Sequence, residues 1–310
     1  MERLLRVLHV PVVVQRSPEW FAKRASRVTS SEASAVLGES KYESATDVMF
    51  RKFGLGRAFT GNAATRYGQH YEPEAIAAYC AALGRVSFEV GLIDYEAVHG
   101  ENKRLAFVAG SPDGITVRRG KQTQQTQTGD GTITQISTPP TVDDPSPLSA
   151  GLIGPLGAER APRTSERSLR AELGDAADDE PVLLEVKCPF RRKIVPGTIP
   201  QHYYAQVQLN MFICGLRVAD FVEYRPSPFE LNIVRVYPDE AWLGNALPVL
   251  VAFHAECASY AGRIHEHPMY AKYVAQHAQH AQRTAVDKPL SCTEDANQPK
   301  DEKTYTFIDE

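Results

Sequence analysis

One short apolar run constrains the fold more than any other part of the sequence. Residues Val182–Lys187 read Val-Leu-Leu-Glu-Val-Lys, and Pro189 ends the run. A run this short and aliphatic is typical of a strand buried inside a sheet. Because side chains alternate along a strand, Glu185 and Lys187 share one face, where a carboxylate and an ammonium must be paired or bound to something. An ordinary ion pair at a strand edge is the simplest interpretation.

The rest of the sequence predicts helices first and strands afterwards. Apolar residues recur at helical spacing behind capping residues in Ser17–Ala25, Ser30–Leu37, Ser44–Phe53 and Glu74–Leu83. Strand-like patterns follow in Val86–Ile93, Phe107–Ala109 and Ile115–Val117. After the apolar run we expect a helix over Gln201–Gly215, strands over Val218–Tyr224 and Leu231–Val236, and a helix from Asp239 to about His265. This order predicts an α/β core with a central mixed sheet flanked by helices.

A long polar stretch, residues 119–180, interrupts this core. It contains no Phe, Trp or Tyr and is rich in Gln, Thr, Pro, Ser and Gly, so it cannot bury enough apolar surface to offset its ordering entropy. We expect a disordered insertion within a single domain over residues 1–283, followed by a flexible polar tail over 284–310. A tolerated surface insertion and a partner-binding or regulatory loop both fit this composition.

Charge, cysteine content and hydropathy exclude several classes of protein. The formal net charge of -4 gives no support to non-specific coating of nucleic acid, so any DNA-binding surface has to be a local basic patch. Five scattered cysteines without a Cys-x-x-Cys pair predict free thiols in a reducing compartment. No run of roughly 18 apolar residues is present. These features predict an intracellular protein outside the membrane, with nucleus and cytoplasm both open.

A second carboxylate gives the Glu185–Lys187 pair a chemical use. Asp113 lies in the turn Ser-Pro-Asp-Gly between two predicted strands, where Asp is usually only a turn residue. The ordered sequence on either side of the insertion joins this hairpin to the Glu185 strand, and adjacent strands would bring both carboxylates together. Two carboxylates, a backbone carbonyl and waters suit one or two Mg²⁺ or Mn²⁺ ions, which activate water in phosphodiester hydrolysis. Lys187 would orient or deprotonate that water, or neutralise charge on phosphorus.

Glu72 is a third candidate carboxylate. It lies next to Pro73 and near Glu74 at the predicted beginning of a helix. Proline fits the first helical turn, and both glutamates would complement the helix dipole there, which accounts for them without any site. Glu72 becomes a candidate metal ligand only in the company of Asp113 and Glu185.

Five blocks of sequence carry a resemblance to a known family. The blocks are Trp20-Phe-Ala-Lys-Arg24 with Val28-Thr-Ser-Ser31-Glu, Gly68-x-x-Tyr-Glu72-x-x-Ala75, Gly110-Ser-Pro-Asp113-Gly, Leu184-Glu185-Val-Lys187-Cys-Pro-Phe190 and Tyr203-Tyr-Ala-Gln206-Val-Gln208-x-x-Met211. In this order they resemble the phage lambda exonuclease and YqaJ-type viral recombinase family, within the PD-(D/E)XK nucleases. Each block alone is weak, whereas five in the family's order are specific.

The resemblance implies a PD-(D/E)XK restriction-endonuclease-like core and roles for particular residues. Asp113 and Glu185 would hold the metal, and Glu72 would support the metal site. Lys187 would assist the nucleophilic water, and Gln206 would point into the site from the next helix.

The resemblance also implies residues that contact DNA. Arg24, Ser31 and Ser111 match a pocket that grips the 5′-phosphate of the recessed strand, and hydroxyls with one guanidinium suit a terminal phosphate. The densest basic cluster near the site is Arg191, Arg192 and Lys193. A solvated turn accounts for it equally well, but beside a phosphodiesterase centre we expect contact with the DNA backbone.

Taken together, the resemblance implies a Mg²⁺- or Mn²⁺-dependent exonuclease that degrades duplex DNA 5′ to 3′. The 3′ single-stranded tails would serve recombination, repair or viral genome processing. DNA ends are the expected substrate, a single-strand annealing protein is the expected partner, and a homo-oligomer is an expectation because the family includes ring-shaped trimers. A structure-specific or nicking endonuclease and a catalytically silent DNA-end-binding scaffold stay open as alternatives.

Overall fold

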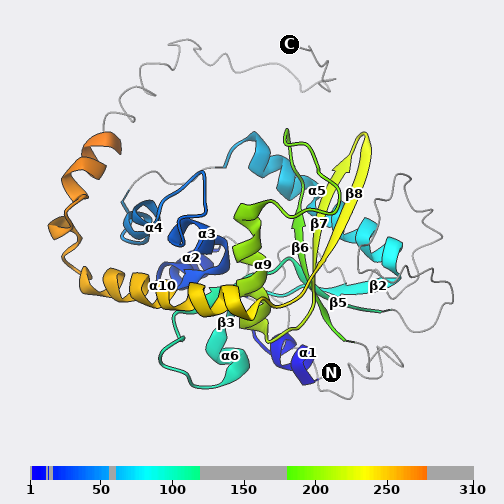
Figure 1. The fold of residues 1–310 in the computed structure, drawn as a ribbon, viewed down its shortest axis with the longest axis horizontal. Coiled ribbons are helices and arrows are strands. Elements are labelled where there is room, and N and C mark those ends of the chain that lie inside the picture. Colours follow the sequence, from blue (N-terminus) through cyan, green and yellow to red (C-terminus); the bar gives the residue numbers. More distant parts are fainter. Residues whose placement is uncertain (1, 12, 14–16, 56–60, 119–179, 278–310) are drawn as a thin grey trace, which may run out of the picture. The chain divides into compact units, whose positions relative to one another are not determined.

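The computed structural model describes residues 2–11, 13, 17–55, 61–118 and 180–277 (Figure 1). Met1–His267 form one compact unit and Pro268–Glu310 a second. The predicted insertion, except its last residue, and the whole predicted tail lie outside the described residues, so the division into residues 1–283 and 284–310 stays a prediction. Within the described ranges, no helix has the length and apolar character needed to cross a membrane.

A five-stranded mixed sheet forms the centre of the first unit (Figure 1). β6 runs parallel to β7, and the other neighbouring pairs are antiparallel. The apolar run is therefore an inner strand, hydrogen-bonded on both sides, as its composition predicts. In spatial order the strands are β2 (Arg85–Phe88), β5 (Gly114–Arg118), β6 (Val182–Lys187), β7 (Ala219–Pro226) and β8 (Phe229–Val236).

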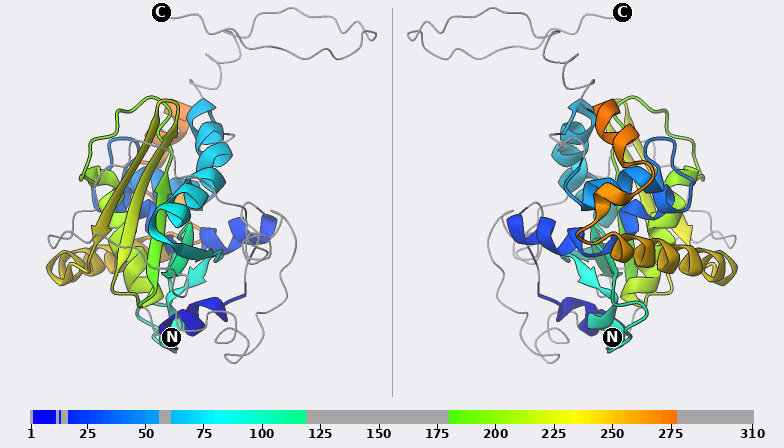
Figure 2. Two further views of the ribbon diagram at one scale, coloured as in Figure 1. Left: turned by 90° about the vertical axis from the view of Figure 1, so that its right-hand side faces the viewer. Right: turned by 90° about the vertical axis from the view of Figure 1, so that its left-hand side faces the viewer.

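Alternation along β6 divides the core into two layers. Leu184 and Val186 pack in one buried cluster with Tyr79 of α5 (Ala63–Leu83), and α5 runs along one side of the sheet in Figure 2. Leu183 packs in the other, larger cluster with Val207 of α9 (Gln201–Cys214). Each fully buried aliphatic side chain contributes about 1.5–3 kcal/mol. The predicted mixed sheet flanked by helices is confirmed.

A second, three-stranded sheet lies earlier in the chain. Its order is β1 (Val28–Thr29), β4 (Val108–Gly110) and β3 (Ile93–Asp94), with β4 parallel to β1 and antiparallel to β3. The predicted hairpin at Ser-Pro-Asp-Gly is wrong, because β4 and β5 belong to different sheets and the turn leads from one sheet to the other. The single strand predicted over Val86–Ile93 is also wrong, because the chain leaves the central sheet before Gly91 and joins the small one after it.

Helices surround the two sheets. Ser44 begins α4 as predicted, because the Asp47 N–H donates to Ser44 Oγ at 3.2 Å and the Ser44 N–H donates to Asp47 Oδ2 at 2.9 Å. The helices of the structure include α1 (Glu2–Leu8), α2 (Pro18–Ala25), η1 (Ser30–Glu32), α3 (Ala33–Val36), α4 (Ala45–Lys52), α6 (Tyr95–His99), α10 (Glu240–Ser259) and η3 (Ile264–Glu266).

The long helix α5 begins earlier than the sequence predicts. It starts at Ala63, capped by Asn62, whose Oδ1 accepts from the Thr65 N–H at 2.9 Å. The predicted start near Glu74 is wrong because the first turns carry few apolar residues and give a weak periodic signal. Pro73 therefore lies inside the helix, and the first-turn dipole role considered for Glu72 does not apply.

Candidate active site

The register of β5 and β6 brings Asp113 and Glu185 to the same end of the central sheet. Gly114 lies opposite Leu184, and the Asp113 N–H continues the ladder by donating to the Leu184 carbonyl at 3.1 Å. Asp113 Oδ2 accepts a further hydrogen bond from the Val186 N–H at 2.7 Å. Two adjacent inner strands therefore hold the two carboxylates together, although they do so without the predicted hairpin.

Glu185 is fully buried, and three side chains donate hydrogen bonds to it. Lys187 Nζ and Gln206 Nε2 each lie 2.5 Å from Glu185 Oε1. Asn210 Nδ2 lies 2.9 Å from Oε2. Lys187 comes from the same face of β6, as strand alternation predicts, whereas the two amides project from α9. One ammonium and two amides therefore fix both carboxylate oxygens.

Burial raises the pKa of both strand carboxyl groups. It raises the pKa of Glu185 to about 7, with Lys187 opposing and Asp113 adding to the shift. It also raises the pKa of Asp113, against the effects of Lys187 and the Val186 N–H. Burial lowers the pKa of Lys187, but the two carboxylates outweigh it and raise that pKa above its usual value. Lys187 therefore keeps its proton at neutral pH, which suits charge neutralisation and not proton abstraction.

Asn210 is a site residue that the sequence analysis missed. Its Oδ1 is buried without a hydrogen-bond partner among the described residues. A Cβ atom at Gly110, the last residue of β4, would lie only 2.3 Å from that oxygen. Glycine at position 110 thus leaves the space that the amide occupies. The spacing of Gln206 and Asn210, four residues apart on one helix face, is the signal that could have indicated this partner of Glu185.

Glu72 approaches the same region from α5. Burial raises the pKa of Cys188 to about 12, and the carboxylates of Glu72 and Asp113 both add to that shift. Two helical turns after Glu72, the Tyr79 hydroxyl donates a 2.6 Å hydrogen bond to Asp220 of β7, which fixes this helix face against the sheet. The described residues contain no preformed group of three carboxylate, thiol or imidazole ligands. Metal ligation by Glu72 therefore stays a prediction.

A divalent cation fits the donors that the two strands supply. The carboxylates of Asp113 and Glu185 face a single ammonium, that of Lys187, in a buried setting that disfavours unbalanced charge. Mg²⁺ binds in proteins through one or two carboxylates while waters complete its octahedral shell, and Mn²⁺ also prefers oxygen ligands. Asp113 and Glu185 are the residues that would hold such an ion.

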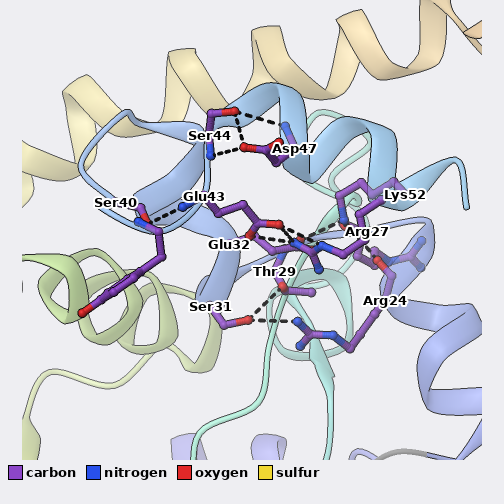
Figure 3. A network of polar contacts seen from close by, with 12 residues as sticks. Arg24, Arg27, Thr29, Ser31, Glu32, Ser40, Glu43, Ser44, Asp47 and Lys52 are labelled. Atoms are coloured by element: carbon purple, nitrogen blue, oxygen red, sulfur yellow. Dashed lines mark hydrogen bonds and ion pairs between the residues drawn. The ribbon is translucent and has the colours of Figure 1, made fainter. Parts of the chain in front are cut away.

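Two residues of the predicted 5′-phosphate pocket lie together (Figure 3). Arg24 Nη2 donates to Ser31 Oγ at 2.9 Å, and the Arg24 guanidinium lies 4.5 Å from the centre of the Trp20 ring. Thr29 Oγ1 lies 3.3 Å from Ser31 Oγ. β1 and β4 are parallel, the last partners in their pairing are Thr29 and Ala109, and Ser31 and Ser111 each follow these residues by two positions. The structure thus brings all three predicted residues to one end of the small sheet.

A buried carboxylate, Glu32, holds this segment in place (Figure 3). Lys52 Nζ lies 2.8 Å from Glu32 Oε2 and also donates to the Arg24 and Arg27 carbonyls. The Thr29 N–H donates to Glu32 Oε2 at 3.0 Å. Burial raises the pKa of Glu32, but Lys52 and Arg24 outweigh it and lower that pKa. Glu32 had no predicted role, although Thr29-Ser-Ser-Glu32 fits a capping-box pattern.

The basic cluster after β6 divides into two parts. Arg192 forms an ion pair with Glu223, which is fully buried on β7. The second oxygen of Glu223 accepts from Asn232 Nδ2 at 3.0 Å. Arg191 and Lys193 are exposed. Arg192 therefore ties its loop to the sheet, and contact of the three cations with the DNA backbone stays a prediction.

Comparison with known proteins places most of the chain in a described family. Residues 19–217 match the YqaJ-like viral recombinase domain. The chain is also similar to an uncharacterized protein of Acanthamoeba polyphaga mimivirus, with 24% identity over 234 residues. That match covers 74% of this chain and 32% of the viral protein, so the chain spans about a third of the length of this relative.

Several solved exonuclease structures are similar to this chain at low identity. An alkaline exonuclease from Laribacter hongkongensis, LHK-Exo, has 22% identity and a TM-score of 0.47, with 87% of this chain and 98% of that one covered. The complex of LHK-Exo with dAMP has the same identity and coverage and a TM-score of 0.48. A phage related exonuclease from Haemophilus somnus has 15% identity, covers 74% of this chain and 92% of that one, and has a TM-score of 0.39.

Proposed function

The chain belongs to the YqaJ-like viral recombinase domain family, and from that premise we propose that it is a divalent-metal-dependent deoxyribonuclease that degrades duplex DNA from its ends. The observation that carries the proposal is the arrangement of Asp113, Glu185 and Lys187 at one end of β5 and β6. Two carboxylates and one permanently charged ammonium suit hydrolysis of a phosphodiester.

Each side chain has a distinct part in this proposal. Asp113 and Glu185 hold Mg²⁺ or Mn²⁺, one ion or two, and Glu72 supports the site from α5. A bound ion of this kind lowers the pKa of its water and stabilises charge on the leaving oxygen. Gln206 keeps one oxygen of Glu185 in place by its 2.5 Å hydrogen bond. Correct orientation of a ligand carboxylate by such partners commonly changes metal affinity about 10–100-fold.

Lys187 acts as a charged hydrogen-bond donor and not as the general base. Its pKa is raised by the two neighbouring carboxylates, although burial alone would lower it. A charged ammonium can orient the attacking water and donate hydrogen bonds to the phosphoryl oxygens as charge develops on them. Of the roles that the sequence allowed for Lys187, we propose water orientation and charge neutralisation.

The direction of degradation follows from the segment that carries Arg24 and Ser31. These two side chains lie 2.9 Å apart, and Ser111 follows the adjacent strand. A guanidinium with hydroxyls binds a terminal phosphate well. We propose that they hold a 5′-phosphate, so that degradation runs 5′ to 3′ and leaves a 3′ single-stranded tail. Such tails are the substrate of a single-strand annealing protein, which we propose as a partner.

Release of nucleotides from a linear duplex tests the activity and its polarity. Duplexes with and without a 5′-phosphate are compared in Mg²⁺, in Mn²⁺ and in EDTA. We expect release only with a metal ion and faster release from the 5′-phosphorylated duplex. Release that needs neither a metal ion nor a particular end would contradict the proposed roles.

Lys187→Ala provides the matched variant for this assay. Removal of one positioned donor that stabilises developing charge costs about 10²–10³-fold in rate, so we expect a loss of at least about a hundredfold. Lys103→Ala, which removes an exposed lysine elsewhere, should keep the wild-type rate. If wild type releases nucleotides no faster than Lys187→Ala and both rates stay at background, a DNA-end-binding scaffold is the better account. Opening of a covalently closed circular duplex would favour an endonuclease.

A further inference from the structure

Three aromatic side chains, one exposed and two half-buried, form a patch beside the proposed catalytic residues. The aromatic patch consists of Tyr67, Tyr71 and Phe190. The ring centroids of Tyr67 and Tyr71 are 4.6 Å apart, and those of Tyr67 and Phe190 are 5.3 Å apart. The first two residues lie one turn apart on α5, and Phe190 comes from the loop after β6.

Packing of the protein core does not account for Phe190. Its side chain is 41% exposed, and it belongs to neither of the two buried clusters found among the described residues. The guanidinium of Arg191 lies 5.4 Å from the centre of the Phe190 ring. An exposed ring in contact with a cation is the composition that proteins use to hold the bases and backbone of single-stranded nucleic acid.

The position of the patch relates it to the proposed site. Tyr71 directly precedes Glu72, and Phe190 follows Lys187 by three residues. Lys187 belongs to the group that contacts the buried carboxylate of Glu185. A DNA strand whose phosphodiester reaches these residues therefore passes close to the aromatic patch, because Tyr71 and Phe190 are near neighbours in sequence of Glu72 and Lys187.

We propose that the aromatic patch stacks an unpaired base of the DNA strand that enters the site. The inference rests on the proposed function and deepens it. A base that leaves its pair at the end of the duplex loses the neighbour on which it stacked. Aromatic rings replace that neighbour for every base, because each base has a π face. The patch therefore serves a nuclease without sequence preference.

A thermodynamic cycle between the protein and the base tests this proposal. The ligand is a fluorescent forked duplex with unpaired ends on both strands, and binding is measured by anisotropy in EDTA, where no hydrolysis occurs. The second ligand is the same fork whose unpaired nucleotides lack their bases. We expect wild type to bind the intact fork about tenfold more tightly than the abasic fork, and Phe190→Ala to bind both at the weaker level.

Two further variants separate stacking from other effects of the substitution. Phe190→Trp should keep the preference for the intact fork that Phe190→Ala loses, because indole also stacks. Tyr237→Ala removes a 59% exposed aromatic residue that follows β8, at the other end of the sheet from Lys187, and should retain the wild-type preference. Thermal unfolding of Phe190→Ala should match wild type, since its ring is not part of the core.

The outcomes distinguish the two proposals. If Phe190→Ala keeps the preference for the intact fork, or weakens both ligands equally, base stacking on the patch is wrong. The same holds if wild type shows no preference. Hydrolysis of linear duplex in Mg²⁺ is measured separately, and its absence would overturn the proposed nuclease without changing the binding comparison.

Discussion

Substitution of Gly110 by alanine tests how closely the small sheet packs against Asn210, a hydrogen-bond partner of Glu185. A Cβ atom at Gly110 would lie 2.3 Å from Asn210 Oδ1 and 3.0 Å from Ile213 Cδ1. Carbon–oxygen contacts are normally no shorter than about 3.3 Å, so the Asn210 amide would have to retreat by about 1 Å. Asn210 is fully buried and has no solvent space into which it could turn.

The retreat of Asn210 also affects Glu185. Asn210 Nδ2 now lies 2.9 Å from Glu185 Oε2, and a shift of about 1 Å takes it beyond hydrogen-bonding distance. Overpacking of a core costs about 1–3 kcal/mol, and a hydrogen bond to a charged group contributes about 1.5–3 kcal/mol. We expect Gly110→Ala to lower the free energy of unfolding by about 2–4 kcal/mol and the affinity for Mn²⁺ by roughly 10–100-fold.

Urea unfolding and calorimetric titration with Mn²⁺ measure these two quantities. Gly244→Ala is the matched control, because a Cβ at Gly244 of α10 meets nothing within 4 Å. That variant should gain about 0.5–1 kcal/mol of stability from the helix and keep its Mn²⁺ affinity.

A double variant decides whether the clash itself is the cause. Asn210→Ala removes the atom that Gly110→Ala would strike most closely, so Gly110→Ala should destabilise the Asn210→Ala protein less than it destabilises wild type. Unchanged stability and Mn²⁺ affinity in Gly110→Ala would refute the reasoning. Strict additivity of the two substitutions would refute it as well.

Two further predictions concern charge. Because burial raises the pKa of Glu185 to about 7, protons compete with the cation, and Mn²⁺ affinity should rise with pH and level off above about 7. The same shift stabilises the folded state only while Glu185 is protonated. The metal-free protein should therefore lose stability as the pH rises to about 7. A melting temperature that increases as the pH rises to about 7 would contradict the raised pKa of Glu185. Arg192→Ala leaves the buried Glu223 with Asn232 as its one remaining side-chain partner in the described part of the chain. It should lower the free energy of unfolding by about 1–3 kcal/mol, less than for a fully buried pair because Arg192 is 32% exposed. Arg191→Ala should change stability by less than about 0.5 kcal/mol, and equal unfolding curves for these two variants would show that the ion pair contributes nothing.

The strand β6 could be predicted from the sequence because its signal is local. Six residues carry both the aliphatic composition of an inner strand and the alternation that places Glu185 and Lys187 on one face. The contact of Gln206 with Glu185 was implied only by the family resemblance. The start of α4 could also be predicted from local sequence, since the capping residues Ser44 and Asp47 lie within one turn.

Contacts between distant segments could not be predicted in this way. Periodicity identified strands on both sides of Asp113 but not their partners, because strand pairing depends on the packing of the whole core. Pro73 indicated a helix start in the sequence, yet the surrounding turns of α5 tolerate it in the interior. The partners of Arg192 and Asn210 are set by β7 and β6, which their own local sequence does not specify.

Anomalous diffraction from crystals soaked in Mn²⁺ tests the central claim most directly, since that claim is a cation shared by the carboxylates of Asp113 and Glu185. We predict a manganese peak about 2.0–2.3 Å from an oxygen of each residue, together with loss of this peak in Glu185→Ala crystals. Density that shows both carboxylates without a shared ion at saturating Mn²⁺, or a peak that persists in the variant, would contradict the account.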